Sequence, residues 1–271
     1  MLFNKTLEMM AGMRLKDMAA EYRRQTELPA MDALSFEERF TLMVEAEWNG
    51  RHDRRLTKLT RDANLLEPAA CLEGIDYDPR RKIDRTQIAR LSDISWVREQ
   101  KHLLITGKTG AGKTWIASAF AGEACRRGLK VRCFKTLRLL NELTLGRSDG
   151  TWIRVVDELL KPDLLVLDDF GIEPLGALHC RDLFEVIDER RIKGSILIAA
   201  QIPVKDWHAV FADKTAADAV MDRLVNNSFR IELEGPSRRG VDQKHKESAS
   251  PLKQNEDEDE EDREVIAAGA V

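Results

Sequence analysis

Eight consecutive residues in the middle of the chain have the types and spacing of a phosphate-binding loop. Residues 107–114 read GKTGAGKT and match the pattern G-x-x-x-x-G-K-[ST]. In this pattern main-chain amides wrap phosphate oxygens, the lysine reaches the β- and γ-phosphates, and the last hydroxyl binds Mg²⁺. The alternative is a glycine-rich turn with a surface lysine. We expect a site for ATP, with Thr114 as a magnesium ligand, formed by Gly107, Lys108, Thr109, Gly110, Ala111, Gly112, Lys113 and Thr114.

Two adjacent carboxylates follow an apolar run further along the chain. Residues 164–168 read LLVLD, and Asp169 comes next. A carboxylate at the end of a buried strand can hold magnesium, so we assign Asp168 to the metal, directly or through water. Asp169 is then placed to polarise the attacking water as a general base. The alternative for Asp169 is that it only caps the turn at Gly171.

A third polar residue, Gln201, follows the apolar run 195–200. We expect this run to be a strand that lies between the strand before the loop and the strand that ends in Asp168. Gln201 would then face the γ-phosphate, where its amide could orient water or sense phosphate loss. A polar residue at a strand end is otherwise a turn former.

The elements that must position these residues are short strands that alternate with helices. Apolar, β-rich runs stand at 102–106, 130–134, 164–168, 195–200 and 229–233. Helical stretches separate them, including 115–126 directly after the loop. Buried strands between helices are typical of a parallel sheet, so the sequence predicts an α/β fold with five parallel strands.

The first part of the chain has helical periodicity instead. Apolar residues at helical spacing predict one amphipathic helix from Leu2 to about Tyr22. Ser35-Phe36-Glu37-Glu38 is a capping box, which predicts a helix that runs through Trp48 and beyond. Its continuation at 51–61 is strongly basic, and residues 80–90 form a second basic run. These runs are either solvated faces or contacts to nucleic-acid phosphates.

Composition places the acidic charge in one segment. The chain has 271 residues and a formal net charge of −4, but residues 241–271 contain ten acidic and four basic side chains. The rest is slightly basic, so the overall acidity does not exclude a nucleic-acid partner. We expect four parts: a helical domain at 1–68, a basic connector at 69–95, a nucleotide-binding domain at 96–235 and a disordered acidic tail at 236–271.

The remaining composition excludes several protein classes. The sequence has no apolar run near 18 residues and no signal-peptide core, so we expect a cytoplasmic protein without a membrane partner. Four cysteines lie far apart, without the spacing of a zinc site or of a disulfide framework.

Several segments together resemble the IstB-like ATP-binding proteins, helpers of insertion-sequence transposases, which are related to the DnaC helicase loaders within the AAA+ ATPases. The resemblance covers about 1–236. It is carried by the loop and by the segments LLVLDDFGIEPL (164–175), SILIAAQIPVKDWHAVF (195–211), DAVMDRLVNNSFRIELEG (218–235) and SFEERFTLMVEAEWNGRHDRRLTKL (35–59).

The resemblance implies an AAA+ core that hydrolyses ATP, assembles into an ATP-dependent oligomer on double-stranded DNA and has a transposase partner. Arg223 resembles the arginine finger that one subunit offers to its neighbour's nucleotide. The N-terminal segment is implied to contact DNA, which favours phosphate contacts by Arg51, Arg54, Arg55, Lys58 and Arg61. The sequence departs from the wider AAA+ pattern at Asp169, where Glu is common, and the shorter acid could slow hydrolysis.

Two other functions remain open from the sequence. A loader of a replicative helicase would share the whole ATPase half and differ only in what the N-terminal domain binds. A small-molecule kinase would use the same loop, but it needs neither a polar residue at the end of strand 195–200 nor a finger after the fourth strand.

Overall fold

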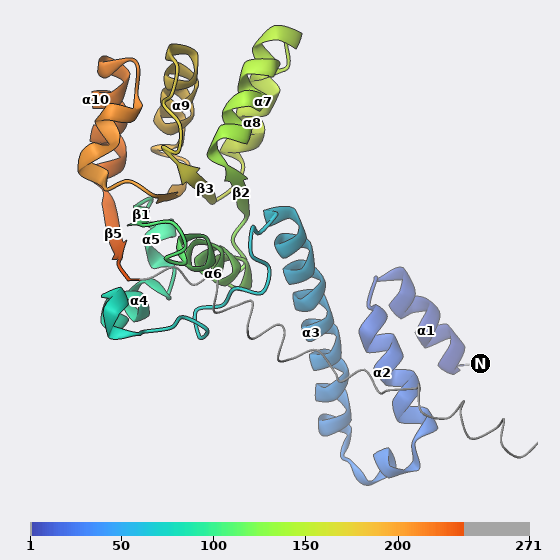
Figure 1. The fold of residues 1–271 in the computed structure, drawn as a ribbon. Coiled ribbons are helices and arrows are strands. Elements are labelled where there is room, and N and C mark those ends of the chain that lie inside the picture. Colours follow the sequence, from blue (N-terminus) through green and yellow to red (C-terminus); the bar gives the residue numbers. More distant parts are fainter. Residues whose placement is uncertain (1, 236–271) are drawn as a thin grey trace, which may run out of the picture. The chain divides into compact units, whose positions relative to one another are not determined.

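A computed structural model of the chain describes residues 2–235, and its centre is a five-stranded parallel sheet (Figure 1). The order across the sheet is β2-β3-β4-β1-β5. The strands are β1 (His102–Gly107), β2 (Val131–Lys135), β3 (Leu164–Phe170), β4 (Ser195–Ala200) and β5 (Ser228–Leu233). The predicted α/β fold is therefore confirmed, and β4 does lie between the two strands that carry the loop and the acids.

Burial along the strands agrees with their places in the sheet. Every residue of the central strand β4 is buried, whereas burial in the edge strands β2 and β5 is interrupted by exposed positions. A central parallel strand is covered on both faces, so it needs a continuous apolar run such as SILIAA. This explains why a continuous apolar run located the central strand in the sequence.

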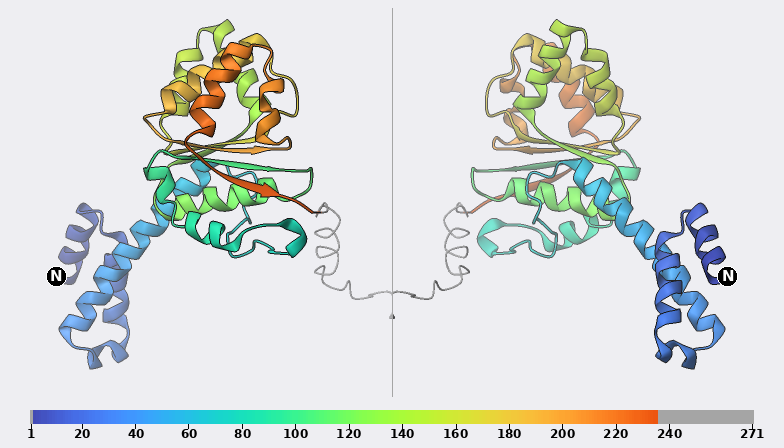
Figure 2. Two further views of the ribbon diagram at one scale, coloured as in Figure 1. Left: turned by 90° about the vertical axis from the view of Figure 1, so that its left-hand side faces the viewer. Right: turned by 90° about the vertical axis from the view of Figure 1, so that its right-hand side faces the viewer.

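Helices cover both faces of the sheet (Figure 2). Helices α4, α5 and α6 pack on one face, and α7 to α10 pack on the other. Alternate residues of β1 serve the two layers, with Leu103 and Ile105 in the first core and Leu104 in the second. The helices are α4 (Arg85–Leu91), α5 (Ser95–Arg98), α6 (Lys113–Arg126), α7 (Thr136–Asp149), α8 (Trp152–Leu160), α9 (Ala177–Arg190) and α10 (Lys214–Val225).

The first predicted helix is two helices, so that prediction was wrong. The chain forms α1 (Leu2–Gly12) and α2 (Lys16–Glu27), and between them Arg14 has a positive φ of 59°. The reversal lets the rings of Phe3 and Tyr22 approach to 5.2 Å between centroids. One continuous helix would hold these rings about 28 Å apart. Gly12, which has a low helix propensity, ends α1.

Helix α3 (Phe36–Ala63) begins as predicted. Ser35 and Glu38 form both hydrogen bonds of the capping box, and Asn64 ends the helix in the left-handed conformation. The carboxylate of Glu47 accepts hydrogen bonds from the main-chain amides of Asp17 and Met18. These bonds attach the start of α2 to the middle of α3. The second half of α3 packs against α6 and β2. This long helix therefore links the N-terminal helices to the sheet.

Residues of the predicted connector contribute to the core beneath α6. Ala70, Ile75, Ile88 and Trp96 are buried in the same cluster as the side chains of α6. The boundaries at 68 and 95 stay predictions. The tail predicted at 236–271 lies outside the described residues.

Candidate nucleotide-binding site

The loop at 107–114 connects the end of β1 to the start of α6, which is the strand–loop–helix setting that a phosphate site requires. At Gly107 a side chain has no room, and at Gly112 it would have to displace the guanidinium of Arg81. A Cβ at Gly107 would stand 2.5 Å from the carbonyl oxygen of Leu233, and one at Gly112 would stand 2.9 Å from Nη2 of Arg81. Gly112 also has a φ of 89°, which favours glycine. The backbone of the loop therefore depends on these residue types.

The side chain of Lys113 lies inside the loop. Its Nζ donates to the carbonyl oxygen of Lys108 at 2.9 Å, and only 6% of the residue is exposed. Lys113 is also the first residue of α6, a helix of 14 residues whose N-terminus adds positive potential. Both features suit the loop for an anion such as a triphosphate.

Asp168 and Thr114 meet beside the loop. Thr114 Oγ1 donates to Asp168 Oδ2 at 3.0 Å, and the hydroxyl of Thr136 donates to the main-chain oxygen of Asp168 at 2.8 Å. Asp168 is fully buried, and among residues 2–235 its Oδ1 has no hydrogen-bond partner. A hydroxyl and a carboxylate with a buried, unsatisfied oxygen fit a hard cation such as Mg²⁺.

Lys135, at the end of β2, is a site residue that the sequence analysis missed. It pairs with Asp168 in the sheet register, and its ammonium donates to Asp168 Oδ2 at 2.8 Å and also to Asp169 Oδ2. Burial opposes the charged form, but these hydrogen bonds outweigh it and raise the pKa of Lys135. The sequence offered only a basic residue at a strand end, and such residues are common on surfaces.

Asp169 stands at an irregular point of β3. It has a positive φ of 57°, and the pairing of β3 with β4 shifts register between Leu167 and Phe170. A residue with a side chain in this conformation costs about 1–2 kcal/mol. Within residues 2–235 its carboxylate accepts from Lys135 and makes no hydrogen bond to the turn at Gly171, so the capping alternative finds no contact here. The role of Asp169 as a base stays a prediction.

Gln201 leaves the end of β4 next to the loop. Its Oε1 accepts a hydrogen bond from Thr109 Oγ1 at 2.7 Å. The sheet order thus brings Gln201 to the loop, as expected, and its role as a sensor stays a prediction.

Arg81 corrects the interpretation of the second basic run. Its guanidinium donates to the carbonyl oxygens of Asp76 at 2.5 Å and Ala111 at 2.8 Å, and only 6% of the residue is exposed. Arg81 is therefore part of the support of the loop and not a surface contact for nucleic acid. A basic run in the sequence does not show which of its arginines is buried and donates to carbonyl groups.

Arg223 lies away from the loop of its own chain. It stands in the last turn of α10, and β5 then begins at Ser228, which pairs with His102 at the start of β1. The loop follows the other end of β1, about 17 Å away along the strand. Arg223 Nε donates to Asp188 Oδ1 at 2.6 Å, and the guanidinium covers the ring of Phe184.

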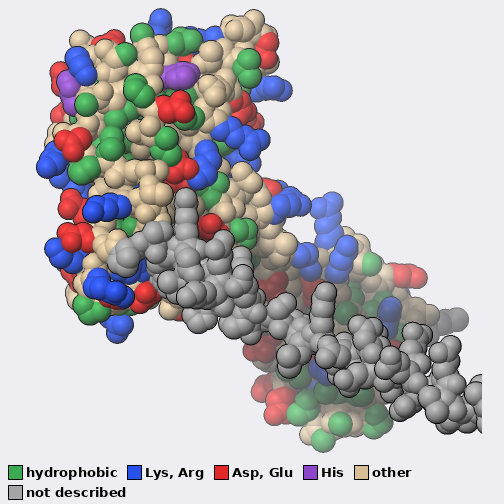
Figure 3. Space-filling model, in the orientation of Figure 1, with side chains coloured by type: hydrophobic (Ala, Val, Ile, Leu, Met, Phe, Trp, Pro, Cys, Tyr) green, Lys and Arg blue, Asp and Glu red, His purple; other side chains and the backbone are tan. Residues whose placement is uncertain are grey.

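The basic residues predicted on α3 lie on one side of the helix and are all exposed. Lys and Arg side chains gather on the face shown in Figure 3 where α3 meets the sheet. Three of the five are paired with acids: Arg51 with Glu47, Arg54 with Asp17 and Arg61 with Asp62. Arg55 donates to the carbonyl oxygen of Gly128, and within residues 2–235 Lys58 has no ion pair.

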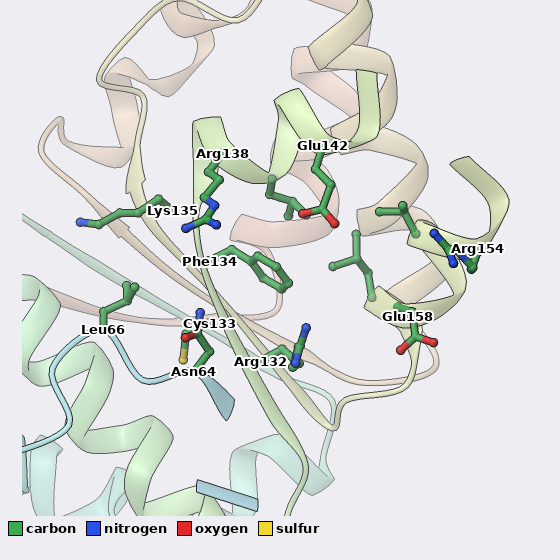
Figure 4. A pocket seen from close by; sticks show the side chains of 13 residues that line it. Asn64, Leu66, Arg132, Cys133, Phe134, Lys135, Arg138, Glu142, Arg154 and Glu158 are labelled. Carbon is green, nitrogen blue, oxygen red and sulfur yellow. The ribbon is translucent and has the colours of Figure 1, made fainter. Parts of the chain in front are cut away.

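A separate pocket of about 540 Å³ lies along the outer edge of β2 and contains no residue of the loop (Figure 4). Arg132, Arg138 and Arg154 line it, together with Glu142 and Glu158. Lys135 belongs to its rim.

The five-stranded order, the loop and the acids at the end of β3 define a P-loop nucleotide-binding fold of the AAA+ type. The chain belongs to the family of IstB-like ATP-binding proteins, whose model matches residues 8–249. The predicted resemblance is confirmed. Within the part of the chain that the structure describes, no helix is long and apolar enough to cross a membrane.

Relatives and solved structures agree with this family. The chain is 37% identical over 239 residues to the insertion sequence ATP-binding protein y4pL of Sinorhizobium fredii, which covers 88% of this chain and 97% of that protein. It is 39% identical over 203 residues to the ATP-binding protein of insertion sequence IS1162 of Pseudomonas fluorescens, which covers 75% of this chain and 88% of that protein.

Two solved structures share the fold. DnaI has a TM-score of 0.53 and 23% identity, and the match covers 63% of this chain and 91% of that chain. AMPPCP-bound DnaA from Aquifex aeolicus has a TM-score of 0.55 and 17% identity, with 77% of this chain and 62% of that chain covered. At these identities the likeness concerns the fold alone.

Proposed function

We propose that this protein binds ATP with magnesium at the loop, hydrolyses it, and uses the nucleotide to assemble on duplex DNA in support of a transposase. The observation that carries the proposal is the hydrogen bond between Thr114 and the buried Asp168, beside a loop in which a Cβ at Gly107 would clash with the main chain of Leu233. Family membership supplies the context of an insertion sequence.

Each residue of the site has a defined part in this chemistry. The loop amides and Lys113 bind and orient the triphosphate, while Thr114 and Asp168 would hold magnesium. Bound magnesium supplies positive charge to the phosphate oxygens. Asp169 takes the proton of the attacking water, and Gln201, which already contacts Thr109 of the loop, orients that water.

Arg223 completes the site of a neighbouring subunit. The sheet separates it from the loop of its own chain, so in a head-to-tail assembly its guanidinium would neutralise charge on the neighbour's phosphates. Before it can do so, it must leave Asp188 or reach past it.

The exposed basic side of α3 supports contact with duplex DNA. An apolar stripe precedes it on the same helix, with Phe36, Phe40, Val44 and Trp48 all exposed at intervals of four residues. A contiguous exposed apolar surface is typical of a protein interface. We assign this stripe to the protein partner, a transposase, and the basic residues to DNA.

A loader of a replicative helicase is the alternative, because the same ATPase half would serve it. Pull-down with the purified chain separates the two: capture of an insertion-sequence transposase supports the proposal, whereas capture of the replicative helicase supports the alternative. The exchange of Trp48 for Ala should weaken capture of the true partner.

Electron microscopy of negatively stained protein with duplex DNA tests the assembly step. Oligomers or filaments that appear only with both ATP and DNA are the expected result. Monomers under all conditions would contradict the proposal. A Lys113→Ala variant is the matched control, since it should remain monomeric with ATP.

A further inference from the structure

One ammonium group stands where the proposed magnesium site needs a metal ion. Lys135 Nζ and Thr114 Oγ1 donate to the same oxygen, Asp168 Oδ2, at 2.8 and 3.0 Å. A metal ion bound to Thr114 Oγ1 and to the carboxylate oxygen nearest that hydroxyl would approach Oδ2. The ammonium and such a metal ion would then compete for this oxygen, although Oδ1 has no partner within residues 2–235.

The charges strengthen this competition. Lys135 also contacts Asp169 Oδ2, so a single positive charge neutralises two adjacent carboxylates. A magnesium ion would bring two further positive charges to the same place. Two cations on one carboxylate oxygen repel each other, and the repulsion is strong beside a fully buried group.

The lysine has a route away from the acids. Its side chain is 45% exposed, whereas that of Asp168 is fully buried. Figure 4 shows the Lys135 side chain pointing away from Phe134 and Arg138, which line the pocket at the sheet edge. The backbone of Lys135 is fixed by its pairing with Asp168 and by the hydrogen bond from Thr136 to Asp168. Only the side chain has to move.

We propose that Lys135 is a positioning residue that holds the place of magnesium: it keeps Asp168 and Asp169 neutralised and ordered until magnesium and ATP enter, and then leaves Asp168. This inference rests on the proposed function, because it requires magnesium-dependent binding of ATP. It implies that ATP binding requires a magnesium concentration high enough to displace Lys135 from Asp168. While Lys135 contacts Asp169, this carboxylate is also engaged and is not free to accept a proton from water.

The test compares magnesium requirements. A fluorescent ATP analogue is titrated against the full chain at a series of magnesium concentrations, and the magnesium concentration that gives half of the maximal affinity is recorded. Lys135→Met removes the ammonium with little change in length, and Lys135→Arg keeps a positive charge. Lys130→Met is the matched control, because Lys130 is an exposed lysine just before the same strand and contacts neither acid.

We expect Lys135→Met to need up to about fivefold less magnesium than wild type, the range set by the loss of a partly exposed ion pair. Lys135→Arg and Lys130→Met should stay close to wild type. In a second measurement, thermal melting without nucleotide, Lys135→Met should gain more from added magnesium than wild type does. A merely structural lysine would not shift the magnesium midpoint.

Two results would overturn the inference, and they differ from each other. If wild type binds ATP with magnesium and Lys135→Met needs the same or more magnesium, displacement of Lys135 by magnesium is wrong and the proposed function stands. If wild type shows no magnesium-dependent binding of ATP, the proposed function is wrong, and so is the displacement of Lys135 that depends on it.

Discussion

The salt dependence of DNA binding can separate the basic residues of α3 that are neutralised within the chain from those that are not. Arg51 and Arg54 lie 2.6 and 2.5 Å from carboxylate oxygens of Glu47 and Asp17. Arg55 and Lys58 have no acidic partner among residues 2–235. A cation that already neutralises a carboxylate displaces fewer counterions when it meets a DNA phosphate.

Two double variants turn this difference into numbers. Replacing Arg55 and Lys58 by Ala should lower the slope of log affinity against log salt by up to about 1.8, because each phosphate contact contributes about 0.9. Between 50 and 200 mM salt, the factor by which DNA affinity falls should therefore be about twelve times smaller for this double variant than for wild type. Replacing Arg51 and Arg54 by Ala should lower the slope by less than half as much.

Fluorescence anisotropy of a labelled duplex, measured with ATP over this salt range, gives the slopes. Circular dichroism checks that the variants fold, since Glu47 also holds the start of α2 through two main-chain amides. The DNA sequence should matter little. An equal loss of slope in both double variants would refute the argument from pairing, and an unchanged slope in both would return the basic side of α3 to a solvated face.

Three further predictions concern the nucleotide site and the sheet. Lys113→Ala should abolish ATP-dependent assembly, whereas Asp169→Asn should bind ATP with magnesium and remain assembled because hydrolysis is slow. Loss of ATP binding in Asp169→Asn would show that the two acids do not divide their roles as proposed. Arg223→Ala should bind ATP yet hydrolyse it poorly. Mixing it with Lys113→Ala should restore part of the hydrolysis, because Arg223→Ala keeps the nucleotide pocket and Lys113→Ala keeps the arginine finger. No recovery in a mixture shown to co-assemble would exclude a role in trans. Burial, together with the charge of a nearby arginine, lowers the pKa of His102 to about 4, so the unfolded chain takes up this proton first as the pH falls. The free energy of unfolding should therefore decrease by about 3 kcal/mol from this residue between about pH 6.5 and 4; urea titrations of His102→Asn, which keeps an acceptor for the amide of Ile196, should lack that decrease.

Local and periodic features of the sequence predicted most of the fold. The capping box at Ser35 and the loop at 107–114 each depend on a few neighbouring residues, and the structure contains both the cap and the expected strand–loop–helix setting. The three inner strands contain continuous apolar runs because a parallel sheet is covered on both faces, and the edge strands are apolar at their buried positions. The sheet order then placed Gln201 beside the loop.

Other contacts between distant residues were not predicted from the sequence. Lys135 lies 33 residues before Asp168 and meets it only because β2 and β3 pair in register. Arg81 lies 30 residues before Ala111, and its charge is used on carbonyl groups inside the molecule. The reversal after Gly12 depends on packing of Phe3 against Tyr22, which helical periodicity cannot distinguish from one longer helix.

The loop and Arg223 lie at opposite ends of the parallel sheet, and this arrangement determines how subunits must meet in the proposed assembly. All strands point the same way, so the loop, Asp168 and Gln201 gather at the carboxyl ends, whereas Arg223 precedes a strand and lies near the amino ends. No rotation of the Arg223 side chain spans the length of β1. If Arg223 acts on phosphate at all, it acts on the nucleotide of another subunit. The rate of hydrolysis per subunit must then rise with protein concentration in wild type, and DNA that brings subunits together must shift that rise to lower concentration. A rate per subunit that stays constant over the range in which oligomers form would place all catalytic groups in one chain and remove Arg223 from the site.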